Sequence, residues 1–334
     1  MGNSMTKNQH FVPQFYLRRF TNQQNLVEVL DRNSMTCERP RGTRRICSAE
    51  FFYGVETGIP DEASQKVEEW FQKREDFIGN NLDSIVEKIL NDKQIEALDK
   101  WTIALLMSML WIRGQEMRKQ IHRIEKEATE WMIQTEYSIR PDRLFDEYEK
   151  KKGVTISAEL RMKFQEMIAS KEFEIQPNNW MHLQNLENIN GFANLFYHQY
   201  WTVYISKASR KFVTTDNPLA TRFPKSKGLL QGKSFLERAH YFPLTPDIFI
   251  LATESHDAPD NPGIRLKRKT LFGGGESEVL ELNIIMARQA HQYLYAKNKK
   301  DLEDMIAEHK RQQEFFATPE GKIAKAQLDA ERQD

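Results

Sequence analysis

Two polar boxes in the sequence hold the residues best suited to chemistry. His10 lies three residues before Pro13, where a short apolar helix is expected to begin, and Asp216 follows Thr215 at the end of a predicted strand. A helix dipole disfavours a charged imidazole at its N-terminus, so His10 is expected to stay neutral and able to accept a proton or bind a metal. A rigid strand end can aim a short carboxylate such as Asp216 into a cleft. The structural alternatives are that His10 bonds a backbone carbonyl, and that Asp216 with Asn217 forms a turn.

Charged residues interrupt the apolar faces of two predicted helices. A helix over about 61–91 places Glu68 and Glu75, seven residues apart, on its apolar stripe, and a second helix over about 92–137 places Arg113 within another. Buried charges are costly unless they are paired. One hypothesis is that Arg113 pairs with Glu68 or Glu75 and fixes how the helices dock. The other is that the three side chains line a pocket.

Basic residues cluster in three segments of a chain that is otherwise neutral. These segments are 207–238, with eight basic residues against two acidic ones, the group Arg39, Arg41, Arg44 and Arg45, and the group Arg265, Lys267, Arg268 and Lys269. Such clusters can attract a phosphate-bearing ligand, and solvated charged loops are the alternative.

The overall composition excludes several classes of protein. Among 334 residues, 48 basic side chains balance 48 acidic ones, which argues against a nucleic-acid coat protein and a polybasic membrane binder. Cys37 and Cys47 are too few for a disulfide framework or a zinc site, and they favour a reducing compartment. The longest apolar run, residues 101–112, is too short to span a bilayer. We therefore predict a cytoplasmic protein without a membrane partner.

Hydrophobic patterning predicts a helix-rich α+β fold. We expect a single domain over 5–316, followed by a polar tail over 317–334. Within the domain, 5–60 holds short strands and the His10 box, 61–200 is almost entirely helical, and 201–296 is β-rich. The strands are expected at 26–30, 45–47, 201–205, 211–214, 239–244, 248–252 and 293–296. The N-terminal and C-terminal strands should form a small mixed or antiparallel sheet, with the helices as a long insertion packed on it.

The box Gln9-His10-Phe11-Val12-Pro13-Gln14-Phe15-Tyr16-Leu17-Arg18-Arg19-Phe20 resembles the opening of domain of unknown function 4238, a mainly bacterial family. The resemblance continues in order over nearly the whole chain, through Ala49-Glu50-Phe51-Phe52-Tyr53, Glu68 and Glu75, Arg113, Thr215-Asp216-Asn217-Pro218, Phe242-Pro243-Leu244-Thr245-Pro246 and Leu282-Asn283. The family's arginine is usually followed by a Thr-Pro-like pair, whereas Gly114-Gln115 follows here. The family has no established activity, so the resemblance selects residues and not a reaction.

Two functions follow as hypotheses. The first is a hydrolase of phosphodiesters or nucleotides, such as a phosphodiesterase or nuclease, with nucleic acid or a nucleotide as its partner. The second is a non-catalytic binding or effector module, for instance in phage defence or as a toxin-like component, whose buried polar residues are structural. The catalytic candidates are His10, Glu75, Arg113 and Asp216, the substrate-binding candidates are Tyr16, Glu68, Asn217 and Asn283, and a divalent metal would have ligands among His10, Glu75 and Asp216.

In the hydrolase hypothesis each catalytic candidate has a role. His10 is the general base or a metal ligand, and Arg113 holds a phosphoryl oxygen. Asp216 acts with Glu75 or Glu68 to bind a divalent ion or to orient water. We therefore expect His10 and Asp216, although far apart in the sequence, to share a pocket with Arg113.

Overall fold

A computed structural model describes residues 6–55, 62–222, 239–253, 266–323 and 325. Helix outweighs strand, and the fold belongs to the predicted α+β class. The limits predicted for the domain, 5–316, stay a prediction, and most of the predicted tail lies outside the described residues.

One antiparallel sheet joins the two ends of the chain. Its strands are β2 (Leu26–Asp31), β3 (Thr36–Gly42), β6 (Thr214–Thr215) and β11 (Tyr293–Ala296), in the order β3-β2-β11-β6. Leu294 of β11 pairs with Leu30 on one side and with Thr215 on the other. The N-terminal strands therefore share a sheet with the C-terminal ones, as expected. A separate two-stranded ribbon pairs β1 (Asn8–His10) with β4 (Ser48–Glu50).

A second, five-stranded sheet is built entirely from the later part of the chain. Its strands are β5 (Tyr200–Ser206), β7 (Ala220–Arg222), β8 (Ala239–Thr245), β9 (Ile248–Thr253) and β10 (Leu266–Leu271), in the order β10-β5-β9-β8-β7. The β10–β5 pair is parallel and the other pairs are antiparallel. Alternate residues of β5, namely Trp201, Val203 and Ile205, are buried in the main core.

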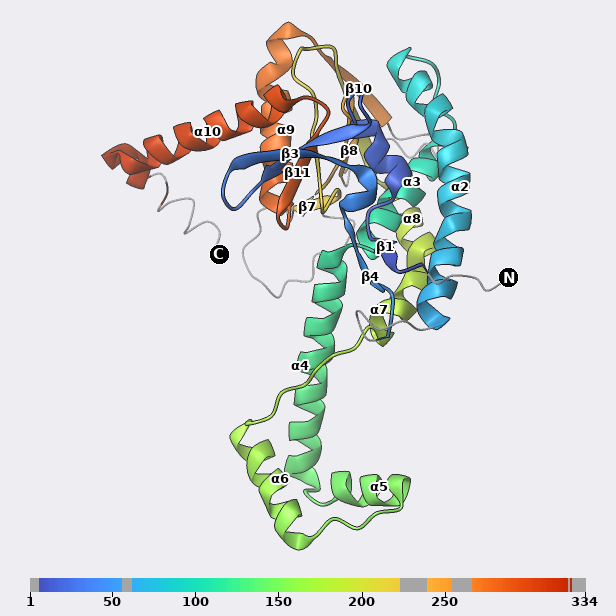
Figure 1. Cartoon of the computed structure of the whole chain (residues 1–334), viewed down its shortest axis with the longest axis vertical. Helices are drawn as coiled ribbons and strands as arrows, with labels where there is room; N and C mark the ends of the chain where they lie inside the picture. The colour runs from blue at the N-terminus through green and yellow to red at the C-terminus, as the bar shows by residue number, and fades with distance from the viewer. Residues whose placement is uncertain (1–5, 56–61, 223–238, 254–265, 324, 326–334) are drawn as a thin grey trace.

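The helical insertion separates the two halves of the first sheet in sequence. It holds α2 (Glu62–Leu90), α3 (Ala97–Ile112), α4 (Gln115–Ile139), α5 (Arg143–Lys152), α6 (Ala158–Ser170), α7 (Trp180–Asn185), the 3-10 turn η3 (Leu186–Asn188) and α8 (Ile189–His198). Most of α3 is buried, and this helix packs between α2 and α8. Figure 1 shows α4 running away from the sheets with α5 and α6 at its far end.

The single helix expected over 92–137 is wrong, because the chain breaks between α3 and α4. Arg113 ends α3, and Gly114 precedes α4 with an extended ψ of 152°. A Cβ atom at Gly114 would lie 3.1 Å from the carbonyl oxygen of Leu110, so the turn leaves little room for a larger residue. The break places Arg113 at the end of a buried helix and starts a new helix at Gln115.

The remaining elements flank the sheets. They are α1 (Gln14–Leu17), the 3-10 turns η1 (Arg18–Phe20), η2 (Thr43–Arg45) and η5 (Gly273–Gly275), α9 (Glu276–Gln289) and α10 (Lys299–Ala317). The helix α9 contacts β6 and β7, whereas α10 contacts β2 and β11. None of the helices in the described part of the chain has the length and hydrophobicity that a bilayer span requires.

Candidate functional site

Arg113 is the centre of a buried charge cluster. Its guanidinium is 1% exposed and donates from Nη1 to Glu75 Oε1 at 2.5 Å, from Nε to the Tyr53 hydroxyl at 2.7 Å, and from Nη2 to the carbonyl of His10. The ring of Phe71 lies 4.1 Å from the guanidinium carbon. The predicted pairing of a buried Arg113 with a glutamate of the preceding helix is therefore confirmed, with Glu75 as the partner. This bond set joins α2, α3 and β1.

Glu68, one heptad before Glu75, faces the same cluster without sharing its bonds. Its Oε1 atom is buried and has no hydrogen-bond partner among the described residues. Burial raises the pKa of Glu68 to about 7; Arg113 opposes the rise and Glu75 adds to it. The carboxyl group therefore takes up a proton in the folded protein at a pH where a solvated glutamate is charged.

We expect Glu68 to make stability depend on pH. The folded-state pKa of about 7 exceeds the ordinary value of 4.5, so between these values the folded state binds more protons. Its contribution to the free energy of unfolding is therefore greatest below pH 4.5 and falls as pH rises to about 7. Glu68→Gln should remove this fall. The free energy of unfolding of the variant should therefore rise by about 1–3 kcal/mol relative to that of the wild type between pH 5 and pH 8. Urea titrations at both pH values measure the change.

The neighbouring, exposed Glu69 provides the matched control. Glu69→Gln should leave the pH profile of the wild type intact. A Glu68→Gln profile parallel to that of the wild type would contradict the raised pKa.

His10 contacts the cluster through its backbone, while its ring contacts Thr43. Its Nε2 atom is 3.3 Å from the carbonyl oxygen of Thr43, and its own backbone carbonyl accepts the bond from Arg113. Burial lowers the pKa of His10, the bond to Thr43 opposes this, and Arg113 lowers it further. The predicted preference for the neutral form is thus supported by burial and a nearby cation, and not by the dipole of the four-residue α1.

Tyr16 and Asn283, predicted to bind substrate, are buried and bonded within the protein. The hydroxyl of Tyr16 lies 2.7 Å from Thr214 Oγ1 and donates to the carbonyl of Pro243 at 2.7 Å. Asn283 accepts from the backbone N–H of Val213 at 3.0 Å and donates to the carbonyl of Lys211 at 2.9 Å. These side chains link α1 to β6 and β8, and α9 to the segment before β6. Their role in substrate binding stays a prediction.

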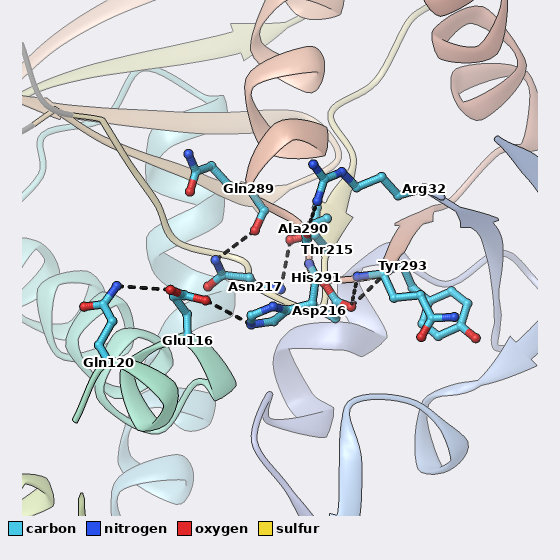
Figure 2. Close-up of polar contacts among 11 residues, drawn as sticks. Arg32, Glu116, Gln120, Thr215, Asp216, Asn217, Gln289, Ala290, His291 and Tyr293 are labelled. Atoms are coloured by element: carbon cyan, nitrogen blue, oxygen red, sulfur yellow. Dashed lines mark hydrogen bonds and ion pairs between the residues drawn. The ribbon is translucent and has the colours of Figure 1, made fainter. Parts of the chain in front are cut away.

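Asp216 and Asn217 form hydrogen bonds to the turn between α9 and β11. Asp216 Oδ1 accepts from the backbone N–H of His291 at 2.8 Å, and Oδ2 accepts from those of Gln292 and Tyr293 at 2.8 and 2.9 Å. Asn217 donates to the carbonyl of Gln289 at 3.0 Å. Figure 2 shows these bonds converging on the turn from the opposite strand end. We call residues 289–293 the clamped turn. The carboxylate of Asp216 thus fixes the backbone of the clamped turn. It also lines the cavity described next.

A cavity of about 430 Å³ opens beside the clamped turn. We call it the basic cavity, because Arg41, Arg45 and Lys119 line it while Asp216 is the one carboxylate among its described lining residues. Its other lining residues are Phe11, Asn33, Ile46, Cys47, Ser48, Gln115, His291, Gln292, Tyr293 and Tyr295. Gln115 is the first residue of α4, so the positive end of a 25-residue helix also faces this space.

The charges around the basic cavity are partly fixed by neighbours. Arg41 pairs with Glu38, and its guanidinium carbon lies 4.9 Å from the ring centre of Tyr293. Arg45 and Lys119 are exposed side chains that come from η2 and α4. An anion entering the cavity therefore meets cations from three separate elements.

His291 is the titratable ring in the basic cavity. Its Nε2 atom is buried without a hydrogen-bond partner among the described residues, and Glu116 Oε2 lies 3.8 Å away (Figure 2). Burial lowers the pKa of His291; Asp216 and Glu116 oppose this, whereas Lys119 and Arg32 add to it. A largely neutral imidazole whose Nε2 atom lacks a hydrogen-bond partner has unused capacity to accept a proton or donate a hydrogen bond.

The predicted catalytic residues fall into two groups. His10, Glu75 and Arg113 share the buried charge cluster, while Asp216 lines the basic cavity. No described contact joins the His10 ring to Asp216, although Phe11, the residue after His10, lines the cavity. Among the described residues, no group of three or more metal-ligating side chains could hold a metal ion, so the candidate ligands His10, Glu75 and Asp216 do not gather.

Sequence reasoning missed His291 and Lys119. Arg41 and Arg45 carried a signal, since they belong to the basic group at 39–45. Lys119 lies among alternating charges of a long helix and His291 follows a helix end, so neither stands out by spacing. Only the pairing of β11 with β6 brings His291 to Asp216.

No curated protein and no solved structure matches the chain. One family model does match, over residues 8–300, and this span includes both the charge cluster and the basic cavity. Because the match covers most of the chain, it identifies the protein as a member of the family described as protein of unknown function (DUF4238).

Proposed function

We propose that the basic cavity binds a phosphate-bearing ligand, such as a nucleotide or a nucleic-acid end. The observation that carries the proposal is the lining: Arg41, Arg45 and Lys119 share the cavity with the carboxylate of Asp216, whose two oxygens already accept three backbone N–H groups. The negative charge of Asp216 is therefore turned toward the protein. Guanidinium groups match the geometry of phosphate oxygens, and a helix start adds further donors.

Calorimetric titration with inorganic phosphate and with a nucleoside 5′-monophosphate tests this proposal. Lys119→Gln should weaken binding of the monophosphate about tenfold, because one charge-assisted contact is lost. Arg123→Gln is the matched control, since Arg123 lies one helical turn further along α4, is 71% exposed on its side chain and does not line the cavity. Binding should also weaken as salt concentration rises. Equal affinities for the two variants, or no binding by the wild type, would refute the proposal.

A second candidate function is hydrolysis of a phosphoester in the same cavity, favoured by the unpartnered Nε2 atom of His291 beside Glu116. In this reaction a water molecule bonds to phosphorus and gives a proton to His291, whose charged ring Glu116 stabilises. The bond from phosphorus to the leaving oxygen breaks, and that oxygen takes up a proton from His291 or from water. The catalytic roles of His10, Glu75, Arg113 and Asp216 stay predictions beside it. Incubation with RNA, DNA and nucleotides, with and without Mg²⁺ or Mn²⁺, tests for product. His291→Ala should abolish turnover and His198→Ala, an exposed histidine on α8, should not. Binding without product would favour the binding or effector module.

A further inference from the structure

A second hollow of about 420 Å³ adjoins the clamped turn at Gln289. Its polar lining comes from Arg32, Thr221, Tyr241, Arg288 and Gln289. None of its described lining residues is acidic, and two of them are arginines. We call it the second hollow. Like the basic cavity, which contains Tyr293, it has cations and an aromatic ring, Tyr241, in its lining.

The clamped turn contributes different residues to the two spaces, and we call this shared segment the ridge. Gln289 lines the second hollow and His291 lines the basic cavity. Asp216 and Asn217 hold the turn from one side, and Arg32 donates to the carbonyl of Ala290 at 2.6 Å from the other (Figure 2). Arg32 is close enough to His291 to lower its pKa. The hollows are therefore neighbours whose relative positions are set by hydrogen bonds.

We propose that the two spaces bind successive phosphates of one ligand, whose intervening nucleoside crosses the ridge. The ligand class is then a single-stranded oligonucleotide of at least two nucleotides. This inference rests on the proposed function of the basic cavity. Paired cationic sites with exposed aromatic rings are typical of surfaces that follow a single strand, where arginines contact phosphates and tyrosines stack on bases. Adjacent phosphates of a nucleoside diphosphate cannot reach across a whole residue of backbone.

A series of three probes tests the inference: a nucleoside 5′-monophosphate, the corresponding 5′-diphosphate and a 5′-phosphorylated dinucleotide. The dinucleotide should bind the wild-type protein about tenfold more tightly than the monophosphate, and the diphosphate should gain far less. Arg288→Gln should remove the advantage of the dinucleotide and leave the affinity for the monophosphate within twofold. Arg311→Gln, at a side chain that is 76% exposed and lines neither space, is the matched control.

The outcomes separate this inference from the proposed function. If the monophosphate binds and Lys119→Gln weakens it, but the dinucleotide shows no advantage, the second hollow is not part of the site. An equal gain for the diphosphate would also overturn the inference, because it would place both phosphates on one side of the ridge. If none of the probes binds, the proposed function fails, and the inference that rests on it fails with it.

Discussion

Arg113→Met should lower the free energy of unfolding by about 3–5 kcal/mol, the largest loss that we expect from a single substitution. The methionine fills much of the volume but leaves Glu75, the Tyr53 hydroxyl and the His10 carbonyl without the donor that now joins them. The half-buried carboxylate then lacks its cation, and the Tyr53 hydroxyl and the His10 carbonyl keep only the bond of 3.1 Å between them, so each loss adds to the cost. Urea unfolding at pH 7 measures the loss.

A double-mutant comparison distinguishes the ion pair from packing. Glu75→Gln in the Arg113→Met background should recover part of the loss, because the uncompensated charge is removed. Arg118→Met is the control: that guanidinium is also partly buried, 3.8 Å from the ring centre of Phe52, but it donates to the backbone carbonyl of Phe52 and not to a carboxylate. Its cost should be about 1 kcal/mol. An Arg113→Met protein with wild-type stability would refute the buried pair.

The charge cluster could be predicted because the pattern that reveals it lies within single helices. A helix imposes a period of 3.6 residues, so Glu68, Glu75 and Arg113 reveal their burial by sharing stripes with apolar residues. Burial then demands a partner of opposite charge. The helix break at Gly114 was missed, since the apolar stripe continues past it to Met117 and Ile121. The apolar pattern shows which helix face is buried. A tight turn that leaves the same face buried in the next helix hardly changes this pattern, so the break is not visible in the sequence.

The strand expected at 45–47 is wrong, because η2 ends at Arg45 and β4 begins only at Ser48. The three-residue strands β1, β4 and β7 were not expected either. The two longer strands that were missed, β3 and β10, are both sheet edges. β3 carries Pro40 and two arginines, and β10 reads Leu-Lys-Arg-Lys-Thr-Leu, so both resemble charged loops in the sequence. Each lies at the end of its sheet, β3 beside β2 and β10 beside β5. Edge strands tolerate proline and commonly carry charges that prevent pairing with other chains. The same residues that protect these edges hide the strands from a search for alternating apolar positions.

The basic cavity could not be predicted because no single segment contains it. Its cations come from β3, η2 and α4, and its histidine from the turn before β11. These segments meet only after β2 and β6 pair with β11, which is a long-range event without a local signal. Asp216 was recognisable as a special residue, but the three backbone donors that occupy its carboxylate belong to residues 75–77 positions later.

Asp216→Ala should lower the free energy of unfolding by about 2–4 kcal/mol and weaken phosphate binding at the same time. The substitution leaves the N–H groups of His291, Gln292 and Tyr293 without their acceptor, in a place where Asp216 itself is 7% exposed. Backbone donors that lose their acceptor in a partly buried place are costly, and a loosened turn no longer fixes the residues that line the two spaces. Amide hydrogen exchange should accelerate at these three residues more than in β5.

Two comparisons show whether the carboxylate of Asp216 acts through the turn or on a ligand. Asp247→Ala removes a carboxylate that is 41% exposed and paired with Lys211, so its effect on stability should be below about 1 kcal/mol. Asp216→Asn keeps one acceptor oxygen and should recover part of the stability, since an amide oxygen can still take the backbone bonds. If Asp216→Ala instead leaves stability and exchange unchanged while turnover is lost, the carboxylate acts on the substrate, and the catalytic role predicted for it is supported against the positioning role that its hydrogen bonds indicate.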